Sequence, residues 1–587
     1  MVRMKRFNRL ASRLVVTVVA AMAAGALVAR AESPADSKPA PAPVNSAMGA
    51  DLFYQVLLGD LKVEEGDPGA GFSLFLDAAR KTNDAQLYQR AVNIALQARS
   101  GESALQAARA WQKAQPQSRK ATQLVLQILI ALNRVDDSAV PLKTAIAMTA
   151  PDERNSVISA IPQIYAHTPD KKLAATVVEK ALDDYLTQPA TAAAAWTTVG
   201  RMRLAADDTA GALDAARRGQ ALDPQSEGPA MLALEMTGPK VPQAEPIVLA
   251  YLAGKPAPEV RMAYVRVLLN AQRLREAGQQ LQILTTSQPG FAPAWLVQGA
   301  LQEQDNDISA AEASLKHYVD LIKTQKPRDE SDRGPVQAYL ALSQIAEKRG
   351  DYPAAQAWLD QIDNAKDLLA VQSQRASILA RQGKLDDGLA LIRGTPERTP
   401  ADARAKLMAQ VQLLRDNKKY QAAYDLLGTA LAQDPRDPDL IYDQAMLADK
   451  LGRPDDMERL LRQLIVIKPD DAQAYNALGY SLADRGERLP EAKQLIQKAL
   501  QYAPTDPFII DSLGWVEYRM GDKEEAARLL EGAYKTRPDT DIAAHLGEVL
   551  WSLGQRERAL SVWKEGHVAD SDNETLKATL KRLRVKL

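Results

Sequence analysis

Prolines recur at a fixed interval in the C-terminal part of this chain of 587 residues. Successive spacings of 34, 35 and 34 residues separate Pro435, Pro469, Pro504 and Pro538. A small residue precedes the last two of these prolines by twelve positions, and a glycine lies upstream of each small residue. This period, with two small residues and then a proline, is typical of antiparallel helix pairs that stack into a solenoid.

The residue types at these positions have a physical explanation. Gly479 and Gly514 in the first helix of a pair, and Ala492 and Ala526 in the second, allow the two helices to touch because their side chains are small. Proline ends the second helix, since it lacks an N–H and disfavours helix in the residue before it. Only 5% of the residues are aromatic, and this composition favours helix throughout. We therefore expect an all-α solenoid of about 15 helix pairs.

The first 31 residues differ from the rest. A basic start precedes an apolar run from Leu14 to Val28, and Ala29-Arg30-Ala31 has the small-x-small pattern of a signal peptidase site. A bilayer span needs roughly 20 apolar residues, and this run is shorter. We predict a signal peptide, residues 1–31, that is cleaved after Ala31. The alternative is an uncleaved anchor in the inner membrane.

Charge and cysteine content exclude several classes of function. Loss of the six basic residues among positions 1–31 would change the net charge from -1 to -7. A mildly acidic product is poorly suited to bind nucleic acid through its phosphates. The chain has no cysteine, which excludes disulfides, a thiol nucleophile, a thiolate metal site and a lipid anchor on an N-terminal cysteine.

The remaining chain divides by composition and by the clarity of the repeat. Residues 32–50 are rich in Pro and Ala and predict a flexible linker. We expect a divergent repeat array over residues 51–400, a well-formed array over 401–571 and a basic capping helix over 572–587. Contact of that last helix with an acidic partner or an anionic membrane is the alternative. The charged loop from Lys323 to Gly334 is expected to be a solvated insertion.

One unit carries a resemblance to a known family. Trp196, Gly200, Ala212 and Pro224 follow one another in the spacing of the tetratricopeptide repeat consensus, and the resemblance extends over most of the chain after residue 31. It implies a right-handed superhelix in which the first helix of each pair lines a concave face.

A narrower resemblance concerns three segments, residues 53–60, 88–95 and 511–519. They are similar to a family of envelope proteins from Gram-negative bacteria, in which a large tetratricopeptide lipoprotein binds a carboxyl-terminal processing protease of the periplasm and brings it substrates. The resemblance implies a periplasmic adaptor, although this chain lacks the cysteine of a lipoprotein. A scaffold for envelope assembly, such as polysaccharide export or outer-membrane biogenesis without a protease, is the alternative.

The sequence contains no motif for catalysis, cofactor binding or metal binding. Nucleophile elbows, phosphate loops, zinc-protease helices and dinucleotide turns are all missing. His545 and His567 lie 22 residues apart and are interpreted as structural histidines rather than a metal pair. We therefore predict a non-enzyme without cofactors; an enzyme with a site in the weakly patterned region 117–190 is a further alternative.

The tetratricopeptide resemblance also implies which residues face the concave groove, where proteins would bind. Tyr, Trp and Arg tend to dominate binding energy at interfaces, and several of them fall at these positions. Trp515 and Trp551 have an alternative role as core residues wedged between helices. The predicted partner-binding residues are Asn476, Tyr480, Phe508, Asp511, Trp515, Tyr518, Arg519, Glu548 and Trp551.

Overall fold

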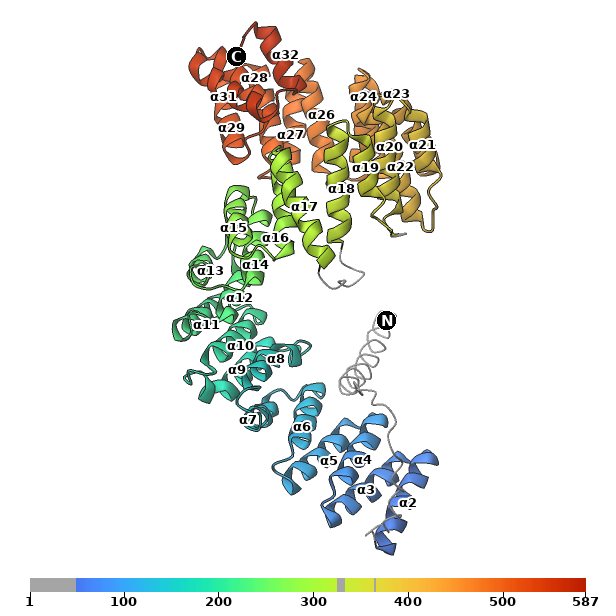
Figure 1. Ribbon diagram of the computed structural model, residues 1–587, viewed down its shortest axis with the longest axis vertical. Coiled ribbons are helices and arrows are strands. Elements are labelled where there is room, and N and C mark those ends of the chain that lie inside the picture. Colours follow the sequence, from blue (N-terminus) through green and yellow to red (C-terminus); the bar gives the residue numbers. More distant parts are fainter. Residues whose placement is uncertain (1–48, 325–332, 364–365) are drawn as a thin grey trace. The chain divides into compact units, whose positions relative to one another are not determined.

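The computed structural model describes residues 49–324, 333–363 and 366–587. These residues form 31 α-helices, α2 to α32, with three short 3-10 helices and no strand (Figure 1). The all-α prediction is confirmed. Taken two by two along the chain, α2 to α31 give fifteen pairs with α32 left single, and the two helices of every pair except α8 and α9 pack against each other. The predicted signal peptide, nearly all of the linker and most of the charged loop lie outside the described residues.

The chain separates into two compact units, residues 1–325 and 326–587. The first contains α2 (Ala50–Glu64), α3 (Pro68–Thr82), α4 (Ala85–Gln97), α5 (Gly101–Ala114), α6 (Arg119–Ala131), α7 (Ala139–Ala147), α8 (Arg154–Ile164), α9 (Lys171–Leu182), α10 (Ala192–Ala205), α11 (Thr209–Leu222), α12 (Glu227–Met236), α13 (Glu245–Leu252), α14 (Pro258–Asn270), α15 (Leu274–Ser287), α16 (Ala292–Gln304) and α17 (Ile308–Thr324). The three 3-10 helices of this unit are Asp136–Ser138, Asp183–Tyr185 and Pro242–Ala244.

The second unit contains α18 (Gly334–Lys348), α19 (Tyr352–Leu359), α20 (Leu368–Arg381), α21 (Leu385–Arg393), α22 (Pro400–Asp416), α23 (Tyr420–Gln433), α24 (Pro438–Lys450), α25 (Pro454–Ile467), α26 (Ala472–Arg485), α27 (Leu489–Tyr502), α28 (Pro507–Met520), α29 (Lys523–Thr536), α30 (Thr540–Ser552), α31 (Arg556–Ala569) and α32 (Glu574–Leu583). In this unit the even-numbered helices α18 to α30 are the first helices of their pairs.

The recurring prolines lie where one pair ends and the next begins. Each is followed within two residues by an aspartate that caps the next first helix, as at Asp471 before α26 and Asp506 before α28. The Asp471 carboxylate accepts a hydrogen bond from the backbone N–H of Ala474, and Asp506 accepts from Phe508 and Ile509. An aspartate in this position satisfies N–H groups that have no partner within the helix. Proline and aspartate together therefore set the helix boundaries.

The small residues lie where paired helices touch, as the sequence predicted. A Cβ atom added at Gly479 would come within 2.6 Å of Ile496 Cγ1 on α27 and 2.9 Å of the Ala492 carbonyl oxygen. At Gly514 it would come within 2.7 Å of Leu530 Cγ on α29. Glycine is needed at these positions because the facing helix occupies the space of any side chain.

The weakly patterned region 117–190 departs from regular pairing. Helix α8 packs mainly against α10 rather than against α9. The phenol of Tyr165, which follows α8, is fully buried and its oxygen lies 2.7 Å from Ser138 Oγ. Helices here are short, with 9 residues in α7 and 11 in α8. Large buried side chains such as Tyr165 thus pack beside small ones such as Ala174 and Ala181 in this region.

Helix α32 covers the last pair. It packs against α30 and α31, and Leu576 is buried while Leu580 and Leu583 are partly buried against the same cluster. The cluster also contains Trp563, whose side chain is fully buried. A terminal helix of this kind shields apolar surface that would otherwise face water.

Candidate functional site

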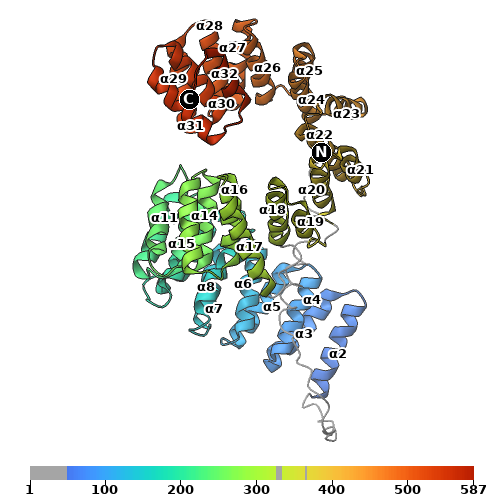
Figure 2. The same ribbon diagram turned by 45° about the horizontal axis from the view of Figure 1, so that its top comes forward.

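From α26 to the C-terminal end of the second unit, the first helices contact one another from pair to pair. Helix α26 contacts α28, α28 contacts α30, and α30 contacts α32, whereas successive second helices of this unit make at most minor contacts. Helices α26 to α32 lie together in one stack (Figure 2). Because the first helices approach each other more closely than the second helices do, the stack curves toward the side that they line. All nine predicted partner-binding residues lie on α26, α28 and α30.

A buried histidine connects three of the first helices. His545 on α30 has Nδ1 3.0 Å from both carboxylate oxygens of Asp511 on α28. On its other side, Nε2 lies 3.2 Å from the Tyr480 hydroxyl on α26. His545 is 3% exposed and Asp511 is 5% exposed. The three side chains form a continuous polar connection across two repeats.

Electrostatics favour the charged form of this histidine. Burial opposes protonation of His545, but the carboxylates of Asp511, Asp541 and Asp484 outweigh it and raise the pKa above its ordinary value of 6.5. Burial also raises the pKa of the Tyr480 phenol. We infer an imidazolium–carboxylate pair, with a tyrosine that stays neutral beside it.

Trp515 on α28 covers this pair. Its ring stacks on the His545 imidazole with centroids 4.3 Å apart and planes at 23°. Its Nε1 donates to Asp484 Oδ1 over 3.3 Å. One helical turn on, Arg519 donates to the Asp484 carbonyl oxygen over 2.7 Å, and its guanidinium lies 5.9 Å from the Trp515 ring centroid. Trp515 is 4% exposed, so its ring belongs largely to the core, as the alternative interpretation has it.

Glu548 on α30 is held by the terminal helix. Arg582 on α32 donates to both of its carboxylate oxygens, over 2.6 and 2.5 Å. Glu548 is 3% exposed, whereas the Arg582 side chain is 55% exposed. The ion pair therefore connects α32 to α30, the first helix of the last pair. The same carboxylate, together with burial, raises the pKa of the neighbouring Tyr518 phenol, with burial as the larger cause.

Pairs of this kind recur along the unit at one repeat of separation. Asp511 and His545 are 34 residues apart, as are Glu548 and Arg582. A buried acid is joined to a basic group on the next first helix in both cases. The same arrangement links Glu347 on α18 to Arg381 on α20, with Nε 2.6 Å from Oε1. In two further ion pairs the order is reversed, because the arginine lies one repeat before the acid: Arg333 with Asp367, and Arg404 with Asp437.

Three predicted residues lie outside the cluster around His545 and Glu548, which consists of Tyr480, Asp484, Asp511, Trp515, Tyr518, Arg519, His545, Glu548 and Arg582. Phe508 is 38% exposed, and the Arg537 guanidinium lies 4.9 Å from its ring centroid. Trp551 is half-buried against α31, with its ring 5.7 Å from Trp563. Asn476 Oδ1 is buried and has no hydrogen-bond partner in the described part of the chain. The role of all nine residues in partner binding stays a prediction.

Sequence reasoning missed three members of the cluster, His545, Asp484 and Arg582. From the sequence, His545 is interpreted only as a structural histidine, and Arg582 only as part of a basic helix. The repeat itself carried the signal, since a spacing of one period places Asp511 opposite His545 and Glu548 opposite Arg582. Asp484 has no such signal, because it is exposed and reaches Trp515 across an irregular spacing.

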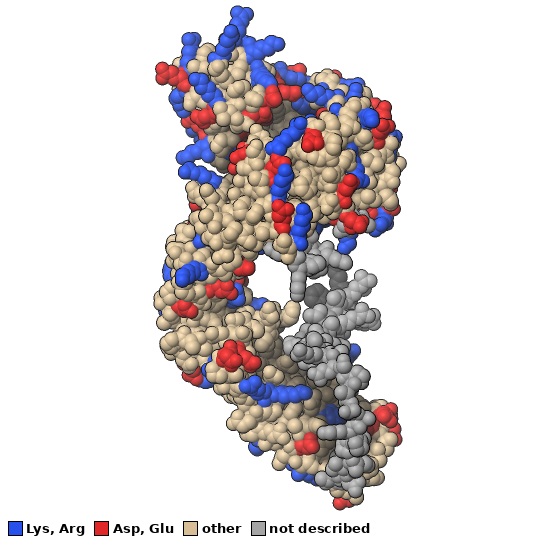
Figure 3. Space-filling model, viewed as in Figure 1, with Lys and Arg blue, Asp and Glu red and all other residues tan. Residues whose placement is uncertain are grey.

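Within the described residues, no group of three or more His, Asp or Glu side chains is placed to hold a metal ion. In the same residues, no helix has the length and apolarity that crossing a membrane requires. Over the second unit, Lys and Arg side chains are interspersed with Asp and Glu on the face that Figure 3 shows. The described part of this face has no extended positive surface of the kind that binds a polyanion.

Two segments of the chain match models of the tetratricopeptide repeat, residues 414–479 and 512–569. Over 246 residues the chain is 33% identical to TPR repeat-containing protein PA4667 of Pseudomonas aeruginosa, a match that covers 42% of each chain. It is 24% identical over 330 residues to cellulose synthase operon protein C of Pseudomonas fluorescens, covering 47% of this chain and 25% of that one. The chain thus spans less than half the length of either relative.

A solved tetratricopeptide repeat protein from Parabacteroides merdae is similar over 42% of this chain and 98% of its own length. Its sequence is 17% identical and the TM-score is 0.32.

Proposed function

We propose that this chain, which carries tetratricopeptide repeats over residues 414–479 and 512–569, is a non-catalytic periplasmic scaffold. In this proposal it binds a carboxyl-terminal processing protease and presents envelope proteins to it as substrates. Reaction chemistry belongs to the protease, and the scaffold acts by holding enzyme and substrate at high effective concentration.

One observation carries the scaffold role. On α28, the accessible Phe508, Tyr518 and Arg519 are attached to a helix whose buried face is fixed by Trp515 and the His545–Asp511 pair. A rigid patch loses little conformational entropy when a partner binds. Aromatic and arginine side chains are also those that contribute most at interfaces. Supported in this way, the patch fits a protein partner better than a small substrate.

The protease as partner is supported by the resemblance of residues 53–60, 88–95 and 511–519 to the envelope adaptors. The patch on α28 lies within the last of these segments. The similar repeat protein of Pseudomonas aeruginosa also comes from a Gram-negative bacterium.

A pull-down tests this proposal. The full chain, tagged and expressed in its own organism, is recovered from envelope extracts, and its companions are identified by mass spectrometry. We expect a carboxyl-terminal processing protease among them, and recovery without one contradicts the proposal. The double variant Phe508→Ala/Arg519→Ala should reduce protease recovery at least about tenfold. Val466→Ala, which removes an 80% exposed side chain from α25, is the matched control.

Export is tested separately. N-terminal sequencing of the protein from the envelope should begin at Glu32, the residue after the predicted cleavage site. A chain that retains Met1 and fractionates with the inner membrane would establish the anchored alternative instead.

Similarity to cellulose synthase operon protein C favours a second candidate, a scaffold for assembly of an envelope polysaccharide. Deletion of the gene should then change the amount of a secreted polymer. In that case the lifetimes of envelope hydrolases should stay unchanged after the deletion, whereas the protease-adaptor proposal predicts that they lengthen.

A further inference from the structure

Arg261 on α14 is a buried cation without a carboxylate partner among the described residues. It is 8% exposed. Its Nη1 donates to Gln280 Oε1 over 2.5 Å and its Nη2 to the Leu252 carbonyl oxygen over 2.7 Å. Both acceptors are neutral, and burial lowers the pKa of the guanidinium. Buried charges are normally paired, because an unpaired one loses its hydration without compensation.

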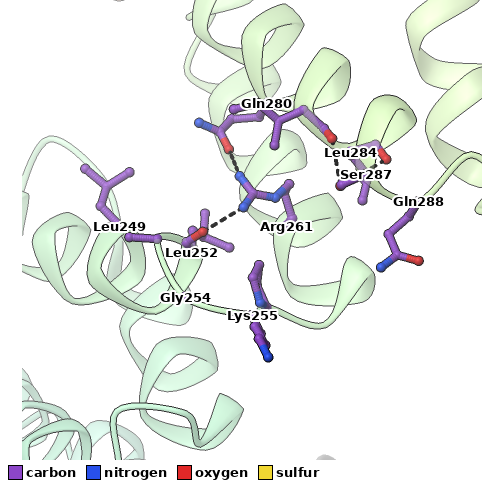
Figure 4. A pocket seen from close by; sticks show the side chains of 12 residues that line it. Leu249, Leu252, Gly254, Lys255, Arg261, Gln280, Leu284, Ser287 and Gln288 are labelled. Carbon is purple, nitrogen blue, oxygen red and sulfur yellow. Dashed lines mark hydrogen bonds between the residues drawn. The ribbon is translucent and has the colours of Figure 1, made fainter.

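A hollow of about 740 Å³ opens beside this arginine, between the end of α13, the loop 253–257, α14 and α15. Figure 4 shows Arg261 between Gln280 and Leu252, with Lys255 beyond it on the loop. Lys255 is exposed. The lining contains these two cations and no Asp or Glu. The lining therefore carries two positive charges and no negative one.

The walls of the hollow are apolar. Leu252 and Leu284 are buried in its base, while Leu249 and Ile283 at its edge are 44% and 46% exposed. Large apolar side chains at this exposure, next to a buried cation, match a ligand with two parts. An anionic group would pair with the guanidinium, and an apolar group would cover the two exposed side chains.

We propose that this hollow binds a carboxylate at the end of an apolar chain, either the free carboxyl end of a peptide or a fatty acid. The carboxylate is received by Arg261 and Lys255, and the apolar part packs on Leu249 and Ile283. A carboxylate suits the site because a planar guanidinium with two donors already engaged offers a narrow edge, and a flat anion with one charge fits that edge.

Titration calorimetry on the purified full chain tests the proposal with four probes. Two are acids, octanoate and an acetylated Ala-Ala-Leu-Leu peptide with a free carboxyl end. Two are matched neutral compounds, 1-octanol and the same peptide as its amide. We expect at least one acid to bind, and its neutral counterpart to bind at least about tenfold more weakly, because a charge-assisted contact is lost. Whichever acid binds identifies the source of the carboxylate.

Substitutions locate the binding site. Ile283→Asp places a negative charge on the exposed edge and should weaken the acid at least about tenfold. Leu222→Asp on α11, at a side chain 49% exposed and outside the hollow, should leave binding unchanged. Arg261→Gln should weaken binding about tenfold to a hundredfold, with its thermal unfolding measured beside it. If Arg261→Gln does not fold, Ile283→Asp alone tests whether the acid binds in this hollow.

Absence of binding by both acids at millimolar concentration would overturn the proposal, as would equal binding of acid and neutral probe or an unaffected Ile283→Asp variant. None of these outcomes bears on the protease adaptor, because no partner protein takes part in the measurement.

Discussion

Substitution of Asp511 by Asn probes the buried histidine on which the α28 patch depends. The change keeps the shape of the side chain and removes its charge. In the native protein the carboxylate lies 3.0 Å from His545 Nδ1, and both residues are buried. Removing one member of a buried ion pair leaves the other without compensation and costs about 3–5 kcal/mol. Since the new amide oxygen can still accept from Nδ1–H, we expect the lower end, about 3 kcal/mol, while the imidazole is charged.

The cost should depend on pH, and its sign follows from the direction of the shift. The pKa of His545 is raised in the folded state above 6.5, so the stabilisation is fully present below pH 6.5 and is lost as the pH rises through the folded-state pKa. Above that pKa the imidazole is neutral and the amide replaces the carboxylate with a loss of about 1 kcal/mol. The variant should therefore be most destabilised in acid.

Hydrogen exchange read by mass spectrometry measures this locally, on peptides from α28 and α30, since repeats need not unfold together. Compared with native protein at the same pH, exchange in Asp511→Asn should be about a hundredfold faster at pH 5.5, and the difference should narrow toward pH 9. Asp425→Asn, at an exposed carboxylate that accepts from Gln421 over 2.7 Å, should change exchange by no more than about twofold. An equal difference at every pH, or one that grows with pH, would refute an imidazolium at this position.

Two further predictions concern packing and the terminal helix. Gly479→Ala should lower the free energy of unfolding in urea by about 1–3 kcal/mol, because the new Cβ would lie 2.6 Å from a side-chain carbon of α27. The control Gly532→Ala, where nothing lies within 4 Å, should raise it by up to about 1 kcal/mol through helix propensity. If Gly532→Ala proves the more destabilising of the two, the packing argument is contradicted. Arg582→Met leaves Glu548 buried without its arginine and should loosen α32 by about 2–3 kcal/mol in hydrogen exchange. Lys581→Met, on the same helix and exposed, should have no such effect. Equal effects of the two substitutions would contradict the claim that the Glu548–Arg582 ion pair stabilises α32.

Several features of the fold could be predicted because their causes are local and repeated. Gly479 and Pro504 act on their own and adjoining helices, and a chain that repeats these instructions every 34 or 35 residues can form only helix pairs of similar length. The all-α class and the number of pairs followed directly from this period. Where the period weakens, between residues 117 and 190, the packing of α8 on α10 had no sequence signal.

For the candidate site, the sequence determined which helix carries Tyr480, Asp511, Trp515 and Arg519 and which face of that helix each occupies. Both follow from their positions relative to the repeat glycines. Only the tertiary structure decided that Trp515 is buried on His545. Stacking of one repeat on the next sets the distance between side chains on successive first helices, and no pattern within a single helix contains that distance. The buried Arg261 and its hollow have the same origin, because the end of α13, α14 and α15 meet there only in the folded chain.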